Sequence, residues 1–327
     1  MAERPVVLIV DDEVNILRSL QRLLRKEPYE LLVAATPEEG LSLVEKQPPT
    51  LIISDYVMPD QNGLEFLRKA KGISADSVAI ILSGYADLDA IVEALNKGEI
   101  YHYITKPWDD NLLKIEIKKS LDQWALLKRQ REMDQNLQAQ LNTTVEILSN
   151  LPHLKDPGVA GKIERVCRLC LLIAEAYPLS PQIVSELERA AKLHKVGNLG
   201  VSSTILNKAG TLTPEERKQV EDHVVFPQLA LRPMKTLDAV CRVIRHHHES
   251  FDGSGYPDQL TGDDIPIASR ILCVVEALDA ILSDRPFRKA LGLEDALKII
   301  QAESGRRYDP KIVELLFRLI RSSVNPI

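Results

Sequence analysis

Five polar residues in the N-terminal part of the chain are of the types that carry out chemistry together. They are Asp11, Asp12, Asp55, Ser83 and Lys106, and each lies at or just after the end of a short apolar run. Carboxylates that converge repel one another unless a hard cation lies between them, and Mg²⁺ prefers such oxygen ligands. A carboxylate held against Mg²⁺ can attack a phosphoryl group, and a lysine and a hydroxyl nearby would then bind the phosphate oxygens.

Histidines form the second group of interest, because six of the seven lie after residue 150. Helical spacing places His194, His223 and His247 on apolar faces that point inward. A lone inward histidine is usually a hydrogen-bonded core residue, whereas several that converge favour a present or ancestral metal site, since imidazole binds metals such as iron. The apolar residues that share these faces are Val184, Leu187 and Ala191, then Val220, and then Val240 and Ile244.

The N-terminal residues must be positioned by alternating strands and helices. Amphipathic helical stretches separate the apolar runs, and one such stretch begins with a capping box that starts at Thr36 and has proline at the first helical position. This alternation predicts a parallel sheet covered on both faces, with ligands at the carboxyl ends of its strands. The five predicted strands are Val6–Val10, Glu30–Ala35, Leu51–Ser54, Val78–Ser83 and Ile100–Thr105.

A long helix is expected to join the two parts. From Trp108 to Leu151 the sequence has no glycine or proline, and apolar residues recur at helical spacing on both sides of a polar middle. We predict one helical linker over residues 110–150, either a connector that crosses solvent or one strand of a dimeric coiled coil. Two ordinary helices with a frayed joint are the alternative.

The rest of the chain reads as helical. One helix is predicted to start at Ser180-Pro181 and to end at Gly197, and another starts with a capping box at Thr213. We therefore predict three parts: residues 1–120 as an α/β domain, residues 110–150 as the linker, and residues 151–327 as an all-α domain. A length of 327 residues suits about two domains.

Composition narrows the classes of function. The apolar fraction of 45% and charged fraction of 27% are those of globular proteins, and the net charge of −6 argues against DNA or an anionic membrane as a partner. The first apolar run is too short for a signal peptide or a membrane span, so we expect a cytoplasmic protein. Cys167 and Cys170 form a C-x-x-C without a second pair at zinc spacing, which favours packed, reduced thiols.

Residues 5–120 resemble the receiver domains of two-component response regulators. The resemblance is carried by Val10-Asp11-Asp12-Glu13, by Asp55 with Met58-Pro59 and Gly63, by Ser83-Gly84 and by Lys106-Pro107. It implies a flavodoxin-like, five-stranded parallel fold in which Asp55 accepts a phosphoryl group from a sensor histidine kinase. The remaining roles that it implies are Mg²⁺ binding by Asp11, Asp12, Asp55 and the Val57 carbonyl, phosphate binding by Ser83 and Lys106, and a switch aromatic at Tyr103, for which simple packing is the alternative.

Residues from about 155 to 320 resemble the HD-GYP phosphodiesterases, which hydrolyse cyclic di-GMP with two or three metal ions. The matching segments include Leu193-His194, His223, His247-His248-Glu249 and Gly255-Tyr256-Pro257. The resemblance implies an all-helical, HD-domain-like bundle. It also implies residual or vestigial metal ligands at His194, His223, His247, His248 and Glu276, and candidate contacts to nucleotide or partner at Gly255, Tyr256, Pro257, Arg285 and Arg288.

Four positions depart from that family's pattern, and the mildest change is Glu276, which aligns with a metal-binding aspartate. Lys195 replaces the aspartate of the His-Asp pair, which bridges two metals in the family, Asn198 replaces a lysine, and Lys162 falls where the family has an early histidine. An ammonium about 4 Å from a dication costs about 8 kcal/mol at an effective dielectric constant of about 20. Lys195 is instead expected to pair with Glu276 and with the region of Asp279. We therefore expect the binuclear site to be lost and iron or manganese binding to be doubtful, although a single ion on His223, His247, His248 and Glu276 stays open.

Three interpretations of function follow. The favoured one is a response regulator with a catalytically inactive HD-GYP output, which acts by sensing cyclic di-GMP or by binding a cyclase or phosphodiesterase domain. The second is an active, metal-dependent cyclic di-GMP phosphodiesterase with an altered metal site. The third is an output that serves only for dimerisation or scaffolding. The linker helix predicts a homodimer in each case.

Overall fold

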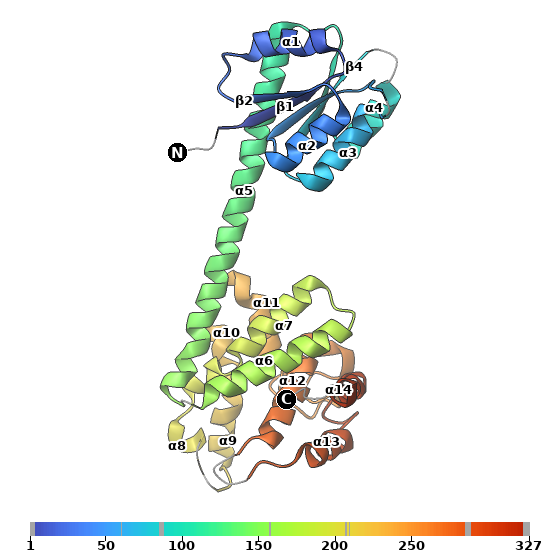
Figure 1. Ribbon diagram of the computed structural model, residues 1–327. Helices are drawn as coiled ribbons and strands as arrows, with labels where there is room; N and C mark the ends of the chain where they lie inside the picture. The colour runs from blue at the N-terminus through green and yellow to red at the C-terminus, as the bar shows by residue number, and fades with distance from the viewer. Residues whose placement is uncertain are drawn as a thin grey trace. The chain divides into compact units, whose positions relative to one another are not determined.

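A computed structural model describes residues 4–59, 61–84, 88–156, 158–206, 208, 210–284 and 289–322. The chain divides into two compact units, Met1–Gln138 and Ala139–Ile327, and the division falls inside one long helix (Figure 1). No helix in these segments has both the length and the apolar character that a membrane crossing requires.

The first unit is built on a five-stranded parallel sheet in the order β2-β1-β3-β4-β5. The predicted strands are confirmed with small shifts at their ends, because β3 includes Asp55 and β5 begins two residues after Ile100. The strands are β1 (Val6–Val10), β2 (Glu30–Ala34), β3 (Leu51–Asp55), β4 (Val78–Ser83) and β5 (His102–Thr105).

Helices cover both faces of this sheet, as a parallel sheet requires. Successive strand residues alternate between two hydrophobic clusters, so Ile52 packs with residues of α3 and α4, whereas Ile53 packs with Leu20 of α1 and Ile117 of α5. The side chain of Thr36 accepts a hydrogen bond from the Glu39 N–H and so caps α2. The covering helices are α1 (Val14–Leu24), α2 (Pro37–Lys46), α3 (Gly63–Ile73) and α4 (Leu88–Asn96).

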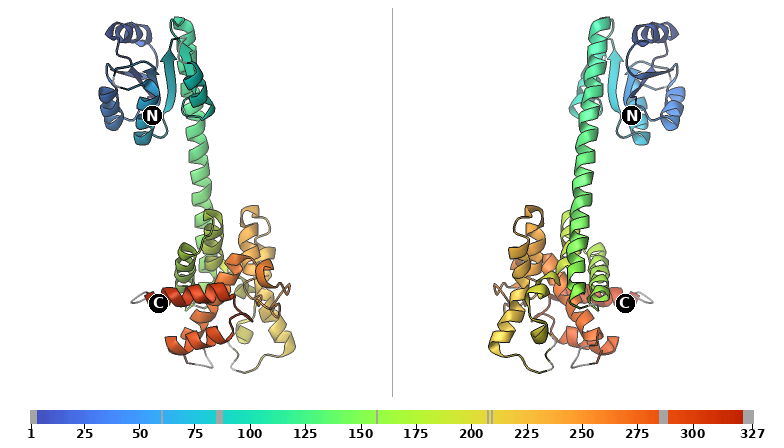
Figure 2. Two further views of the ribbon diagram at one scale, coloured as in Figure 1. Left: turned by 90° about the vertical axis from the view of Figure 1, so that its right-hand side faces the viewer. Right: turned by 90° about the vertical axis from the view of Figure 1, so that its left-hand side faces the viewer.

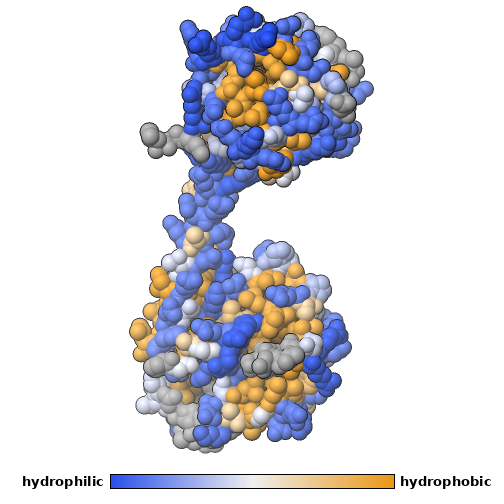
Figure 3. Space-filling model, viewed as in Figure 1, coloured by the Kyte–Doolittle hydropathy of each residue, from blue (hydrophilic) through white to orange (hydrophobic). Residues whose placement is uncertain are grey.

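One continuous helix, α5 (Asp110–Asn150), spans the residues that were predicted as the linker (Figure 2). Near its start, Leu113 and Ile117 are buried in the receiver-like core, and near its end Val145 is buried in the C-terminal core. Every residue from 126 to 140 is exposed. On the face drawn in Figure 3 this middle part is mostly hydrophilic.

Helices are the main regular elements in the described segments of the second unit, with one isolated β-bridge between Ser304 and Tyr308. Its core joins Cys170 of α6, Leu187 of α7 and Leu272 of α12. All four cysteines are free thiols. Its longer helices are α6 (Val159–Ala176), α7 (Pro181–Leu193), α9 (Pro214–Glu221), α11 (Asp238–Arg245), α12 (Ile267–Leu282), α13 (Leu293–Ala302) and α14 (Pro310–Ser322). Its shorter elements are η2 (Leu151–Leu154), η3 (Val196–Gly200), α8 (Ser203–Leu206), η4 (Asp222–Val224), α10 (Phe226–Ala230), η5 (Lys235–Leu237) and η6 (Gly262–Asp264).

Of two sequence-based helix predictions in this unit, one is confirmed and one is wrong about where the helix ends. The capping box at Thr213 is present, since its side chain accepts from the Glu216 N–H and the Glu216 carboxylate accepts from the Thr213 N–H. The helix that starts at Ser180 does not run to Gly197, however, because α7 ends at Leu193 and a separate 3₁₀ turn, η3, follows. This break matters because it frees His194 and Lys195 to turn toward a common centre.

Candidate functional site

Three carboxylates meet at the carboxyl edge of the sheet. Asp11 follows β1 and Asp55 ends β3, and both are buried, whereas Asp12 is exposed. One oxygen of each lies within 4.8 Å of the others. Such an open set of oxygens suits a hard cation that keeps part of its water, which is how Mg²⁺ binds.

Lys106 neutralises two of these carboxylates in the structure. Its Nζ lies 2.9 Å from Asp11 Oδ2 and 2.9 Å from Asp55 Oδ1. Burial raises the pKa of Asp55, and the hydrogen bond from Lys106 only partly offsets this rise. Burial alone would lower the pKa of Lys106, but its hydrogen bonds to Asp55 and Asp11 raise it overall, so the ammonium stays charged beside the carboxylate.

The other predicted residues of this edge are close by. Ser83 ends β4, is buried, and donates its hydroxyl to the Gly84 carbonyl at 2.9 Å. Val57 is exposed on the loop that follows Asp55. Tyr103 lies in β5 and is partly buried against the sheet core, an arrangement that is compatible with both the switch role and simple packing.

Gly63 fixes the loop that follows Asp55. Its N–H donates to the Tyr56 carbonyl at 2.8 Å, and a Cβ at this position would lie 2.0 Å from the Asp55 carbonyl oxygen. The backbone of α3 therefore approaches the end of β3, which carries Asp55, as closely as a residue without a side chain allows.

Gly63→Ala is expected to destabilise the N-terminal unit by about 2–4 kcal/mol, because the backbone atom that it strikes cannot move aside cheaply. Gly72→Ala in the same helix is the matched control, since its Cβ would meet nothing within 4 Å and should add about 0.5–1 kcal/mol. Urea unfolding followed by tryptophan fluorescence isolates this unit, because Trp108 and Trp124 both pack against its core. Equal unfolding midpoints for the two variants would contradict this account.

The second site gathers histidines from three parts of the C-terminal unit. His194 follows α7, His223 lies in η4, and His247 and His248 follow α11. His194, His223 and His247 are buried. Ligand atoms of His223, His247 and His248 lie within 4.8 Å of one another. The inward direction predicted from helical spacing is therefore correct.

Backbone carbonyls hold three of these rings in one tautomer. Nδ1 of His194, His223 and His247 each contacts the carbonyl oxygen three residues earlier, at 2.7, 2.5 and 2.5 Å. A carbonyl oxygen can only accept, so Nδ1 carries a proton in each ring, and in the neutral ring Nε2 presents its lone pair to the centre. This is the arrangement in which proteins present imidazole to a metal ion.

Glu276 of α12 lies at the middle of the cluster with its two oxygens in different surroundings. Oε2 lies 3.2 Å from His247 Nε2 and 3.8 Å from His248 Nε2. Oε1 lies 4.0 Å from His194 Nε2 and binds the Lys195 ammonium. Lys195 therefore fills one side of the carboxylate, and the other side faces imidazole nitrogens.

The electrostatics keep His194, His223 and His248 neutral and Glu276 charged. Burial lowers the pKa of His194 to about 3, assisted by Lys195, and lowers the pKa of His223 to about 4, assisted by His247. Burial also brings the pKa of His248 well below its usual value. Burial alone would raise the pKa of Glu276, but the Lys195 ammonium and its imidazole neighbours hold it well below the usual range.

Unpartnered atoms show which part of this cluster fits a metal ion. His194 Nε2, His247 Nε2 and Glu276 Oε2 are buried without a hydrogen bond, and the last two are acceptors that face each other. A cation between acceptors satisfies both, so His223, His247, His248 and Glu276 Oε2 fit one ion. The side of His194 does not fit a second, because an ammonium already occupies Oε1.

Two different protein-family models match the N-terminal and the C-terminal part of the chain. Residues 7–118 match the response regulator receiver domain family, and residues 146–312 match the HD domain family. The chain is 30% identical over 328 residues to the cyclic di-GMP phosphodiesterase response regulator RpfG of Xanthomonas campestris, an alignment that covers 95% of this chain and 87% of that protein. This chain belongs to the response regulators that carry a receiver domain and an HD domain.

Two further relatives of this response regulator are enzymes by name. It is 30% identical over 333 residues to a cyclic di-GMP phosphodiesterase of Thermotoga maritima, covering 96% of this chain and 90% of that protein. It is also 34% identical over 173 residues to 3'3'-cGAMP-specific phosphodiesterase 3 of Vibrio cholerae, covering 53% of this chain and 38% of that protein.

Three of the positions that were expected to depart from the family pattern lie in different environments. Lys195 pairs with Glu276 as expected, but Asp279 does not join that pair, because it binds Arg165 Nε at 2.7 Å. Arg165, which lies one turn after Lys162 on α6, therefore forms the ion pair with Asp279 that was expected for Lys195. Lys162 is partly buried, with Asp156 4.0 Å away as its ion-pair partner.

The backbone carbonyl of Asn198 takes part in a set of hydrogen bonds that the sequence analysis did not predict. The ammonium of Lys155, just after η2, donates to the carbonyl oxygens of Asn198, Leu199 and Val201. These carbonyls end the turn that starts beside Lys195, and Gly197 in the same turn packs so closely that a Cβ would lie 1.8 Å from the His223 carbonyl oxygen. A lysine in a polar loop gave no sequence signal for this contact.

The Gly255-Tyr256-Pro257 loop borders the histidine cluster. The Tyr256 ring lies 5.2 Å from the His248 ring, centroid to centroid, and its N–H donates to the His248 carbonyl. Gly255 passes so close to the Ser250 backbone that a Cβ would lie 2.1 Å from its nitrogen. The loop is therefore part of the site's wall. Arg285 and Arg288, the other predicted contact residues, lie outside the described residues.

A second acidic and histidine cluster beneath this loop is structural. Asp258 accepts two hydrogen bonds of 2.6 Å from Arg245 and one of 2.9 Å from His246 Nε2. Its N–H donates to Glu249 Oε1 at 2.7 Å. The Arg245 guanidinium neutralises the Asp258 carboxylate, so this cluster holds the loop in place and is a poor site for a metal cation.

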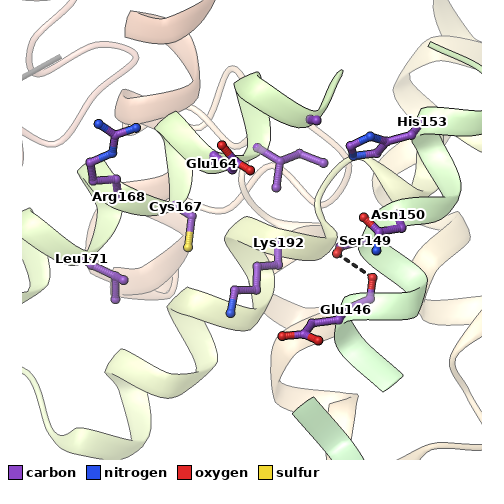
Figure 4. Close-up of a pocket in the computed structure, with 11 residues that line it drawn as sticks. Glu146, Ser149, Asn150, His153, Glu164, Cys167, Arg168, Leu171 and Lys192 are labelled. Atoms are coloured by element: carbon purple, nitrogen blue, oxygen red, sulfur yellow. Dashed lines mark hydrogen bonds between the residues drawn. The ribbon is translucent and has the colours of Figure 1, made fainter. Parts of the chain in front are cut away.

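A separate cavity of about 520 Å³ lies where the end of α5 meets α6 and α7 (Figure 4). Glu146 and Asn150 line it from α5, Glu164 and Cys167 from α6, and Lys192 from α7. Its lining carries charges of both signs and belongs to elements other than those that present His223 and His247. The helix α7 borders both features, because it carries Lys192 and ends just before His194.

Proposed function

We propose that this response regulator accepts a phosphoryl group on Asp55 from a sensor histidine kinase, and that its HD domain is an output that binds and does not hydrolyse. The observation that carries the second part is the ion pair between Lys195 and Glu276 inside the histidine cluster. The output would then act in cyclic di-GMP signalling, either by holding the nucleotide or by contacting a cyclase or phosphodiesterase domain.

The receiver geometry supports phosphoryl transfer. Asp11, Asp12 and Asp55 would hold Mg²⁺, which supplies charge neutralisation for the incoming phosphoryl group. Lys106 already contacts Asp55, and Ser83 lies at the end of the neighbouring strand, so both are placed to bind phosphate oxygens.

The electrostatics of the HD domain argue against a two-metal centre. A bridging carboxylate is what lets two dications lie side by side, and a lysine at position 195 replaces that anion by a cation. The repulsion of about 8 kcal/mol per dication is an upper figure, but a fraction of it suffices to empty a typical site. Lys195 instead supplies one positive charge beside the Oε1 atom of Glu276.

The surroundings of the histidine cluster include groups that could bind a nucleotide. Tyr256 offers an aromatic face beside the histidines, and the relatives named above act on cyclic dinucleotides according to their names. Aromatic faces and cationic side chains are the groups that hold purine rings and phosphodiesters. These features support a cyclic dinucleotide as the ligand and, through the same loop, a partner domain that senses its presence.

A second function, a phosphodiesterase with one metal ion, is favoured by a specific observation. The Nε2 atoms of His247 and its neighbours are directed at Glu276 Oε2, and the ring tautomers suit metal binding. One ion there could polarise a phosphodiester oxygen as a Lewis acid. Turnover would then depend on the histidines but would proceed without a bridged pair of ions.

The two functions are separated by assaying the full chain with cyclic di-GMP and with 3'3'-cGAMP after loading with Mn²⁺ or, without oxygen, with Fe²⁺. Binding by calorimetry without linear product supports the binding output. Turnover that His247→Ala abolishes would replace it by the one-metal phosphodiesterase. Absence of both binding and turnover would leave partner recognition as the output, to be checked by pull-down with cyclase and phosphodiesterase domains.

A further inference from the structure

Lys155 joins the end of the linker helix to the turn beside the histidine cluster. The helix α5 ends at Asn150, η2 follows it directly, and Lys155 is the first residue after η2. Its ammonium donates to the carbonyl oxygens of Asn198 at 3.1 Å and Leu199 at 3.4 Å, and also to that of Val201. An ammonium has three N–H donors, so these carbonyls can take all of them.

The surroundings of Lys155 give its charge no other role. In the part of the chain that the structure describes, its ammonium forms no ion pair with a carboxylate. The neighbouring Asp156 accepts from the Gly158 N–H at 3.0 Å and lies 4.0 Å from Lys162. Hydrogen bonds from a charged donor are stronger than neutral ones, so three of them on one short segment hold the backbone of η3 in place.

The turn η3 lies against two parts of the histidine cluster. Lys195, which precedes η3 and pairs with Glu276, accepts a hydrogen bond on its carbonyl from the Asn198 N–H at 3.1 Å. A Cβ on Gly197 would lie 1.8 Å from the His223 carbonyl oxygen, so the turn and the His223 backbone are in direct contact. A shift of η3 would therefore displace both Lys195 and His223.

We propose that Lys155 is a positioning residue of the histidine cluster. By holding η3 to the end of α5, it keeps His223 and Lys195 in the arrangement that accepts one divalent ion beside Glu276. The inference rests on the single-ion site proposed above and adds how the linker reaches that site. Because coupling between two sites acts in both directions, the ion and the end of α5 influence each other through Lys155.

Calorimetric titration of the full chain with Mn²⁺, in Mg²⁺ that saturates the receiver site, tests the positioning role. The heat that His247→Ala abolishes is assigned to the HD domain. Lys155→Met should weaken this binding about tenfold, as removal of a group that orients metal ligands does. Lys155→Arg keeps the charge and the N–H donors and should recover most of the affinity.

Lys235→Met is the matched control, because Lys235 lies in another 3₁₀ turn, η5, and its side chain is 79% exposed. It should bind Mn²⁺ like the wild type. A wild-type chain that binds no ion in the HD domain, or equal affinities for Lys155→Met and Lys235→Met, would overturn the proposal.

Hydrogen exchange of the metal-free chain separates positioning from a loss of stability. Lys155→Met should speed the exchange of amides in η3 and in residues 222–225 several-fold and should leave the core helix α12 as in the wild type. Faster exchange throughout the unit, or unchanged exchange in η3, would argue that Lys155 does not position this turn and would overturn the proposal.

The same method tests the connection to the linker. Mn²⁺ at a saturating concentration should slow exchange in residues 149–155 of the wild type, and saturation of Lys155→Met should leave these residues unchanged. Equal slowing in both chains would mean that the ion reaches α5 by another route and would contradict the coupling. Neither measurement uses a nucleotide, so failure of this proposal and failure of the proposed nucleotide-binding output are observed separately.

Discussion

Replacing Lys195 by aspartate, together with Lys162→His, is expected to raise the affinity of the HD domain for a second divalent ion at least about a hundredfold. The reason is that the change removes an ammonium from the Glu276 carboxylate and supplies an anion in its place. Because the Nε2 atom of His194 is buried and unpartnered on that side, it becomes available to the same ion.

A series of variants separates the loss of the cation from the gain of a ligand. Lys195→Met removes the charge only and should allow weak binding of a second ion, whereas Lys195→Asp adds the bridging oxygens and should bind it firmly. Lys298→Asp makes the same change of charge on the exposed surface of α13 and serves as the control. Calorimetric titration with Mn²⁺ counts the ions, with the receiver site saturated by Mg²⁺. No difference between Lys195→Asp and Lys298→Asp would contradict the electrostatic account.

Asp55→Asn is expected to lower phosphoryl incorporation at least about a hundredfold, because an amide oxygen is a far weaker nucleophile than a carboxylate. The substitution keeps the shape of the side chain, and the Tyr56 N–H can still donate to its oxygen. Incubation with acetyl phosphate and Mg²⁺ followed by intact-protein mass spectrometry measures the covalent adduct directly.

Asp89→Asn on α4 is the matched control, since Asp89 is exposed and lies outside the carboxylate cluster. It should incorporate phosphoryl groups like the wild type. An adduct on the Asp55→Asn variant that matches the wild type in extent would place the phosphoacceptor elsewhere and would remove the proposed role of this edge of the sheet.

Much of the receiver domain could be predicted from its sequence because its signals are local. A strand of fully buried residues such as β1 must be covered on both sides, and a polar residue at its end must lie at the sheet edge. The meeting of Asp11, Asp55 and Lys106 follows from the topology alone. The close approach of Gly63 does not, because it depends on how α3 packs against the strand end.

The HD domain was less predictable, because its site is assembled from pairings between distant elements. Helical spacing gave the inward direction of His194 and His247, and charge gave the pairing of Lys195 with Glu276. Asp279 pairs with Arg165 and not with Lys195. Two cations are near two carboxylates of α12, and spacing along the sequence does not show which cation binds which carboxylate. The contact of Lys155 with three carbonyls depends on a loop path that has no periodic signal.

Anomalous diffraction from crystals loaded with Fe²⁺ without oxygen, measured at the iron edge, tests the central claim most directly, because it locates each ion beside its ligands. The account predicts at most one peak in the HD domain, beside His223, His247 and His248, with Lys195 still bound to Glu276. Two peaks of full occupancy that share a ligand near His194, with Lys195 turned away, would contradict it.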